Sequence, residues 1–427
     1  MTRAYLALLR ENRNFRLLWW AQIVSELGDW FYTLAVYNLL LDLTGSRAQS
    51  VGLAVVLQVL PSTLIAPTAG VVNDRVRRKG VMIAADVARF FIVLSMLFVR
   101  SRGMVWLVYP LLFLENLGVG FFEPAHSSVI PNIVSGDRVL IANALSSITW
   151  SFCLATGAAL GGVAAAWLGR DAVFVLNALS FLGSASLISR MQFAEPHADS
   201  HAPLCARDLA DFTPVLEGFR YIRRHPRLFA TVFVKAGGGL LGANNVLLPI
   251  LGEHVFPLHV AGLDHSRGAL LGMSMLMGAR GAGALLGPLV SGRWAHNRDS
   301  RLRSGIFVGF LVAAAGYASL GASTSFAVAV LAVIAAHAGT STNWVFSSTL
   351  LQIYTEDRFR GRVFSADYGL CMLTISASSY LAGVALDLGV APRTFAIGLG
   401  AVMIVPAVSW ALALRGTRQL PAATDAS

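Results

Sequence analysis

The chain has 427 residues, of which 56% are hydrophobic and only 13% charged, and its formal net charge is +10. A soluble domain carries roughly 25% charged residues because its surface faces water, so this composition excludes an ordinary soluble protein and favours a membrane protein. The positive charge does not indicate a nucleic-acid partner, because the basic residues lie in short loops between apolar runs rather than in one basic domain.

Twelve apolar runs are long enough to cross a bilayer as helices. A bilayer core about 30 Å thick requires about 20 apolar residues in a helix. The runs cover residues 17–42, 50–73, 80–100, 104–126, 139–168, 171–192, 227–252, 267–294, 304–322, 325–350, 363–388 and 393–414. In the fifth run, Gly157 and Gly161 are four residues apart, a spacing that lets two membrane helices approach closely.

The distribution of lysine and arginine predicts the orientation of these spans. If the N-terminus lies inside, basic residues on the cytoplasmic side outnumber those outside by about four to one, as the positive-inside rule requires. Both termini are therefore predicted to lie in the cytoplasm, and the expected location is the bacterial inner (plasma) membrane.

One long polar connection divides six spans from six. It ends in an amphipathic stretch, Leu209–Ile222, which we expect to form a surface helix at the membrane interface. The predicted organisation is an N-terminal six-helix bundle (1–192), a cytoplasmic linker with this helix (193–226), a C-terminal six-helix bundle (227–414) and a cytoplasmic tail (415–427).

The two halves are related in sequence. After the fourth span the chain reads SSVIPNIVSGDRV from Ser127, and after the tenth it reads SSTLLQIYTEDRF from Ser347, with several identities at one constant offset. A duplicated six-helix unit with a substrate site between its copies is a transporter architecture. We therefore predict an all-α membrane protein of twelve transmembrane helices in two pseudo-symmetric six-helix bundles.

The loop after the second span carries a motif. It reads GVVNDRVRRK and resembles the G-x-x-x-D-R-x-G-R-K signature of the major facilitator superfamily, with Arg77 in place of the second glycine. The matching residues are Gly70, Asp74, Arg75, Arg78 and Lys79. This resemblance implies the major facilitator fold, transport by alternating access, and a role for the motif in holding one conformational state.

Further segments resemble the drug-exporter branch of that superfamily, which contains macrolide efflux proteins and the enterobactin exporter. They are NRNFRLLW from Asn12, SELGDW from Ser25 and DRFRGRVF from Asp357. The fifth span differs from many antiporters: it reads GAALGG from Gly157, where their pattern is G-P-x-x-G-G. Antiport therefore stays a hypothesis.

Ionisable residues within membrane spans are costly and usually line a cavity or a transport pathway. Glu26 and Asp29 lie three residues apart in the first span, hence on one helix face. Two poorly hydrated carboxylates at that distance cannot both be ionised cheaply, which is what a proton-coupling site requires. Glu115, in the fourth span, is the third proton-coupling candidate. The alternative for Glu26 and Asp29 is a structural hydrogen bond or ion pair with a neighbouring helix.

Other ionisable residues in the spans have more than one interpretation. Asp86, Arg89 and Glu123 are expected to form a charge network beneath the N-terminal half. The cations of the second half, Lys235 and Arg280, are expected either to neutralise carboxylates of the first half or to bind an anionic substrate. Lys235 precedes a run of glycines that is expected to break its helix.

The predicted function is secondary active transport, with a proton-coupled exporter of amphipathic small molecules (drug or macrolide-like) as the leading hypothesis. The expected partners are a small-molecule substrate, protons and the lipid bilayer, and the expected state is a monomer. The alternatives are a siderophore exporter, a lysophospholipid flippase on the same fold, or a non-transporting membrane sensor. An enzyme is not expected, because no nucleophile–base pair occurs at usable spacing. Neither a metal site nor a nucleotide loop nor any other cofactor is predicted.

Overall fold

The computed structural model describes residues 2–134, 138–195, 213–258, 265–295, 298–356 and 359–417. Within these ranges the regular structure is helical and no strand occurs. The α-helices are α1 (Thr2–Glu11), α2 (Arg13–Thr44), α3 (Ala48–Arg75), α4 (Arg78–Ser95), α5 (Val108–Ile133), α6 (Arg138–Leu168), α7 (Arg170–Ser189), α9 (Thr213–Arg224), α10 (Pro226–Gly239), α11 (Asn244–His254), α12 (His265–Ala295), α13 (Asp299–Ala322), α14 (Phe326–Tyr354), α15 (Arg360–Asp387), α16 (Pro392–Val402) and α17 (Ile404–Thr417). Three 3₁₀ segments are η1 (Met96–Phe98), η2 (Arg102–Leu107) and η4 (Leu240–Ala243).

Ten stretches in the described part of the chain are helical, long and apolar enough to cross a membrane. They correspond to ten of the predicted spans. The other two predicted spans, 17–42 and 227–252, fall on α2 and on α10 with α11. The predicted all-helical membrane fold is therefore confirmed, and the count of twelve is consistent with the helices present.

The described residues form two compact units. Unit 1 comprises residues 1–211, 244–281 and 379–389, and unit 2 comprises 212–243, 282–378 and 390–427. The predicted bundle boundaries stay a prediction. Half of the predicted linker at 193–226, residues 196–212, lies outside the described residues. α9 covers part of its amphipathic stretch. The predicted tail at 415–427 also lies mostly outside them.

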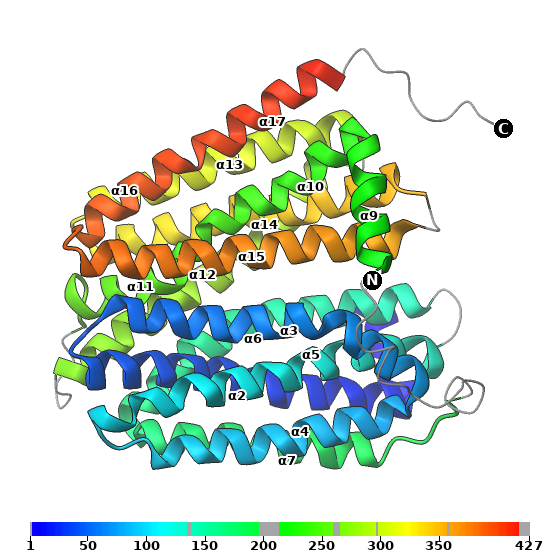
Figure 1. Cartoon of the computed structure of the whole chain (residues 1–427), viewed down its shortest axis with the longest axis horizontal. Coiled ribbons are helices and arrows are strands. Elements are labelled where there is room, and N and C mark those ends of the chain that lie inside the picture. Colours follow the sequence, from blue (N-terminus) through cyan, green and yellow to red (C-terminus); the bar gives the residue numbers. More distant parts are fainter. Residues whose placement is uncertain are drawn as a thin grey trace. The chain divides into compact units, whose positions relative to one another are not determined.

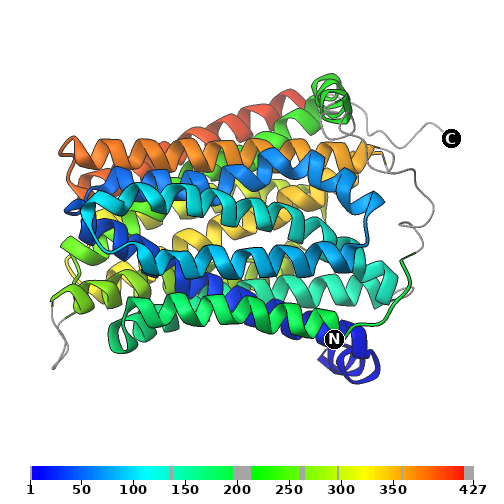
Figure 2. The ribbon, with the colours of Figure 1, turned by 60° about the horizontal axis from the view of Figure 1, so that its bottom comes forward.

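In unit 1, the long helices run side by side (Figures 1 and 2). α2 packs against α6 and α7, while α4 packs against α5 and α7. A Cβ atom on Gly157 would lie 2.8 Å from Trp30 Cβ, and one on Gly161 would lie 2.8 Å from the Cα atom of Phe31. Glycine is therefore needed at both positions for α6 to approach α2, as their spacing predicted.

In unit 2, α13 packs against α14 and α16, and α10 packs against α14 and α17. The helix that follows the linker is interrupted: α10 ends at Gly239, and η4 connects it to α11. This interruption confirms the helix break predicted from the glycine run. It sets the end of α10 four residues beyond Lys235.

Candidate functional site

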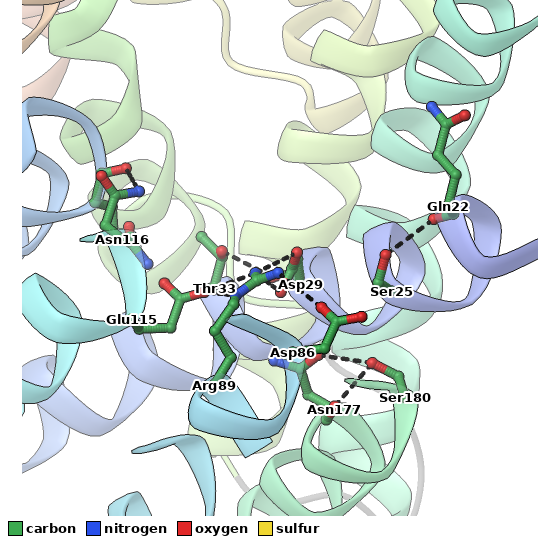
Figure 3. Close-up of polar contacts among 11 residues, drawn as sticks. Gln22, Ser25, Asp29, Thr33, Asp86, Arg89, Glu115, Asn116, Asn177 and Ser180 are labelled. Carbon is green, nitrogen blue, oxygen red and sulfur yellow. Dashed lines mark hydrogen bonds and ion pairs between the residues drawn. The ribbon is translucent and has the colours of Figure 1, made fainter. Parts of the chain in front are cut away.

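A buried arginine connects three helices of unit 1. Arg89 Nη2 on α4 donates to both carboxylate oxygens of Asp29 on α2, at 3.0 and 2.9 Å. The same guanidinium donates through Nε and Nη2 to Glu115 Oε1 on α5, at 2.9 and 2.7 Å. Figure 3 shows the two carboxyl groups beside the arginine side chain. Arg89 thus links α2, α4 and α5 through charge-assisted hydrogen bonds, which are the strong class.

An acid and an aromatic ring also lie beside the Arg89 guanidinium. Asp86, one turn earlier on α4, has Oδ1 3.9 Å from Arg89 Nη1. The guanidinium carbon lies 3.9 Å from the centre of the Phe181 ring, a cation–π distance. Three carboxyl groups therefore surround one guanidinium.

The acids of this cluster differ in their exposure. The side chains of Asp86 and Glu115 are 0% and 7% exposed, and that of Arg89 is 4% exposed. Asp29 is 33% exposed. Asp29 is therefore the acid of this cluster that is accessible from the space beside it.

That space is a small polar cavity of about 50 Å³. It is lined by Gln22, Ser25, Glu26, Asp29, Arg89, Val119, Phe122, Glu123 and His126. Glu26 Oε1 accepts a hydrogen bond from Gln22 Nε2 at 2.8 Å. A cavity of this size with several polar walls can hold a water molecule or two. The cavity is therefore lined by three acids, Glu26, Asp29 and Glu123, and a carboxyl group there could exchange a proton with water.

The sequence predicts two separate groups, the proton-coupling candidates and the charge network. In the structure, residues of the two groups are in contact. Arg89, predicted as part of a separate network, is bonded to the proton-coupling candidates Asp29 and Glu115. Glu26 and Glu123 share the cavity with Asp29. The roles of these residues remain predictions.

Two basic residues of the predicted loop motif bind the ends of neighbouring helices. Arg78 donates through Nε to the carbonyl oxygen of Asn73 at 3.1 Å and through Nη1 to that of Ser128 at 3.0 Å. Lys79 Nζ donates to the carbonyl oxygen of Met191 at 2.7 Å. These bonds tie the start of α4 to α5 and to the segment that follows α7.

The other residues of the motif lie on α3. Arg75 is the last residue of α3. A Cβ atom on Gly70 would meet no atom within 4 Å, so packing in unit 1 does not require glycine there. The side chain of Asp74 lies outside the described part of the structure. The role of the motif in a conformational state stays a prediction.

The predicted cations of the second half lie in different units. Lys235 Nζ bonds to Asp367 Oδ2 at 2.5 Å in unit 2, rather than to a carboxylate of the first half. Arg280 Nη1 donates to Asn245 Oδ1 at 2.5 Å in unit 1.

Sequence reasoning did not single out Asp367 or His126. Asp367 is a charged residue within the predicted span 363–388, and this was the signal that could have revealed it. His126 lies beside Glu123 at the end of the predicted span 104–126, and only the packing of α5 against α2 and α4 brings it to the cavity.

Comparison with known proteins identifies relatives of the chain. A family model described as transmembrane secretion effector matches residues 4–425. The MFS-type transporter YfiS of Bacillus subtilis is 26% identical over 287 residues, which cover 67% of this chain and 65% of that protein. Macrolide efflux protein A of Streptococcus pyogenes is 26% identical over 291 residues, with 66% and 67% coverage. The putative bacilysin exporter BacE of Bacillus subtilis is 24% identical over 316 residues, with 72% and 73% coverage.

Solved structures share the fold. A POT family transporter in complex with a thioalcohol-conjugated peptide has a TM-score of 0.74 at 12% identity, covering 95% of this chain and 97% of that one. The nucleoside transporter NupG has a TM-score of 0.69 at 11% identity, covering 93% and 99%. At these identities the likeness concerns the fold alone.

Proposed function

Because the chain belongs to the transmembrane secretion effector family of major facilitator transporters, we propose that it is a proton-driven exporter of amphipathic small molecules. The observation that carries this proposal is the cluster of Asp29, Glu115 and Arg89, in which Arg89 and Glu115 are buried and Asp29 is partly exposed beside a polar cavity. A transporter that runs on protons needs a buried acid that can reach water in one state and whose protonation changes a contact between helices. Two features of the cluster support this proposal: Asp29 is partly exposed beside the cavity, and Arg89 bonds to acids on two other helices.

The charge balance of the cluster supports proton exchange. Asp29, Asp86 and Glu115 together carry more negative charge than Arg89 neutralises when all are ionised. Uncompensated charge within a protein interior costs several kcal/mol per ion. Protonation of one carboxyl brings the cluster closer to neutrality, and Asp29, the exposed member beside the cavity, is the acid that we propose takes up the proton.

Protonation at Asp29 would also change the helix contacts. A neutral carboxyl loses the ionic part of its two bonds to Arg89, while Glu115 keeps its own. The link between α4 and α2 would then weaken and the link between α4 and α5 would remain. We propose that this difference biases α2 between two arrangements, as alternating access requires.

The proposed cargo and direction rest on the relatives. Two of them are named macrolide efflux protein A and bacilysin exporter. Export of a small molecule is what these names share. We propose that the cargo here is amphipathic and that it leaves across the bacterial inner membrane, with both termini in the cytoplasm and a monomer as the working state. Siderophore export, lysophospholipid flipping and a sensor role are the competing functions that the experiment must separate.

The test is transport by the full chain in liposomes with an imposed pH gradient. A panel of macrolides, other amphipathic drugs, siderophores and lysophospholipids is offered to the wild type, Glu26→Gln and Asp29→Asn. We expect gradient-driven movement of at least one amphipathic drug by the wild type. Asp29→Asn should lose the gradient dependence and at least tenfold in rate, because it keeps the shape of the side chain but cannot exchange a proton.

Arg100→Lys is the matched control, because Arg100 pairs with Asp171 at an exposed position of unit 1. It should transport like the wild type. Movement of every cargo at the same rate with and without the gradient would overturn the proposed proton drive. Gradient-driven movement of siderophores or lysophospholipids alone would replace the proposed cargo.

A further inference from the structure

Unit 2 contains an ion pair between two membrane helices. Lys235 Nζ on α10 lies 2.5 Å from Asp367 Oδ2 on α15, and the two side chains are 4% and 0% exposed. Charges at such positions are costly and are typical of substrate or ion pathways. The pair lies outside the cluster around Arg89, so the proposed proton site leaves it unused.

The ammonium group of Lys235 lies in surroundings that suit an organic cation. Its Nζ is 4.6 Å from the centre of the Trp344 ring and 5.6 Å from that of Phe364. Aromatic faces combined with a carboxylate are the arrangement that binds ammonium ligands. The ammonium group of Lys235 therefore occupies a position that would also suit the cationic group of a bound molecule.

Asp367 has capacity for a second partner. Its Oδ1 atom is buried and has no hydrogen-bond partner within the described part of the chain. A buried acceptor of this kind is uncommon in folded proteins and calls for an explanation. A carboxylate with one oxygen bonded to Lys235 and one oxygen unsatisfied is suited to receive a second cation.

Local packing brings these groups together, and one of the two aromatic residues is exposed. A Cβ atom on Gly239 would lie 3.0 Å from the carbonyl oxygen of Cys371, so glycine lets α10 approach α15 one turn beyond Lys235. Trp344 is 41% exposed. A cargo molecule would therefore contact this residue first and then displace the lysine ammonium.

We propose that Lys235 and Asp367 form a site where an organic cation of the cargo exchanges for a proton. The cation takes the place of the lysine ammonium between Asp367 and the two aromatic rings. Lys235 becomes a neutral amine: one N–H bond breaks, its electron pair stays on Nζ, and the proton passes to water. One positive charge enters and one leaves, so the site stays neutral overall.

Cation binding and proton release are coupled by electrostatics. Cation binding without proton release would leave two positive charges beside one carboxylate, at a cost of several kcal/mol in a buried site. The titratable groups that act on the pair, besides its own two members, include the thiol of Cys371 on α15. This inference rests on the proposed function and names its cargo as an amphipathic organic cation.

The experiment measures binding of tetraphenylphosphonium, a permanent organic cation, to the purified full chain in lipid nanodiscs. A pH-indicator dye in weak buffer records proton release at pH 7, and triphenylphosphine oxide is the uncharged comparison. For the wild type we expect one proton released per cation bound, and affinity for the cation that rises about tenfold per pH unit. Triphenylphosphine oxide should release none.

Three variants separate the possible outcomes. Lys235→Arg keeps a cation beside Asp367 but one that cannot lose its proton, so it should bind tetraphenylphosphonium at least tenfold more weakly than the wild type, with affinity independent of pH and no proton release. Asp367→Asn should lose at least tenfold in affinity. Because this change leaves one buried charge, the double variant K235M/D367N keeps the site neutral; it should fold like the wild type and bind the cation as weakly as Asp367→Asn.

Cation binding with undiminished proton release by the double variant would overturn the inference. Unchanged pH dependence in Lys235→Arg would overturn it as well. These outcomes are distinct from failure of the proposed function, which is judged by gradient-driven transport in liposomes. A wild type that exports under a pH gradient but shows no Lys235-dependent proton release refutes only the exchange site.

Discussion

The geometry of Arg89 depends on its guanidinium rather than on positive charge alone. The group reaches Asp29 on α2 and Glu115 on α5 at the same time, whereas a lysine ammonium is a point charge that cannot reproduce this planar fork. Arg89→Lys should therefore leave a buried carboxylate poorly compensated and destabilise the protein by about 3 kcal/mol, a value at the low end for a broken buried pair. Thermal unfolding of the protein in detergent measures this loss.

Arg100→Lys provides the control for this substitution. Arg100 and Asp171 are 60% and 51% exposed, and exposed pairs contribute about 0–1 kcal/mol. A loss of similar size in both variants would show that the cluster around Arg89 contributes no more than a surface ion pair.

The sequence revealed the members of this cluster, and Glu26 of the adjacent cavity, but not their connections. Glu26, Asp29, Glu115, Asp86 and Arg89 all stood out because a charge within an apolar run is costly. Their pairing depends on the rotation of α2, α4 and α5 about their axes. Helical spacing predicts which residues of one helix share a face, and it does not predict which face of a second helix lies opposite.

At the scale of the helix, close packing of α5 against α4 determines the position of Arg89. A Cβ atom on Gly118 of α5 would lie 2.8 Å from Arg89 Cγ and 3.1 Å from Arg89 Cδ. Gly118→Val should push the arginine stem away and separate the guanidinium from Asp29. We expect at least a tenfold loss of gradient-driven transport and destabilisation of about 1–3 kcal/mol, typical of overpacking.

Gly398→Ala is the control for a glycine change in a helix. Gly398 lies in α16, and its Cβ would meet no atom within 4 Å. Since alanine favours helices over glycine by about 1 kcal/mol, this variant should be as stable as the wild type or more so. Wild-type transport by Gly118→Val would contradict the importance of the α4–α5 contact.

The helices themselves were largely predictable, since apolar runs in a membrane have few other conformations. Ten of the predicted spans correspond to long apolar helices. The other two fall on α2, with Glu26 and Asp29 inside it, and on the interrupted α10 and α11. These two segments differ from a simple apolar span, α2 by its acids and the second segment by the break after α10. Both segments also supply residues to the candidate sites, namely Asp29 and Lys235.

At the scale of the whole molecule, unit 1 combines segments of both sequence halves. It includes residues 244–281 and 379–389 besides the first 211 residues. Asp387, at the end of α15, accepts the backbone N–H groups of Ala48 and Gln49 at 2.8 and 2.9 Å. These amides begin α3 and have no partner within their own helix, so a carboxylate there satisfies them and interacts favourably with the helix dipole.

The contact between Asp387 and α3 joins the two sequence halves, so a transporter that alternates access must break it or carry it along. Asp387→Ala should therefore loosen this end of unit 1. Loss of a helix cap costs about 1–2 kcal/mol, so hydrogen exchange of the amides of residues 48 and 49 should become roughly tenfold faster. Asp42→Ala removes an exposed ion pair of α2 with Arg170 and should leave these amides unchanged. Equal exchange in both variants would mean that Asp387 does not hold the start of α3. Faster exchange in Asp387→Ala alone, together with an altered transport rate, would make this contact part of the transport cycle.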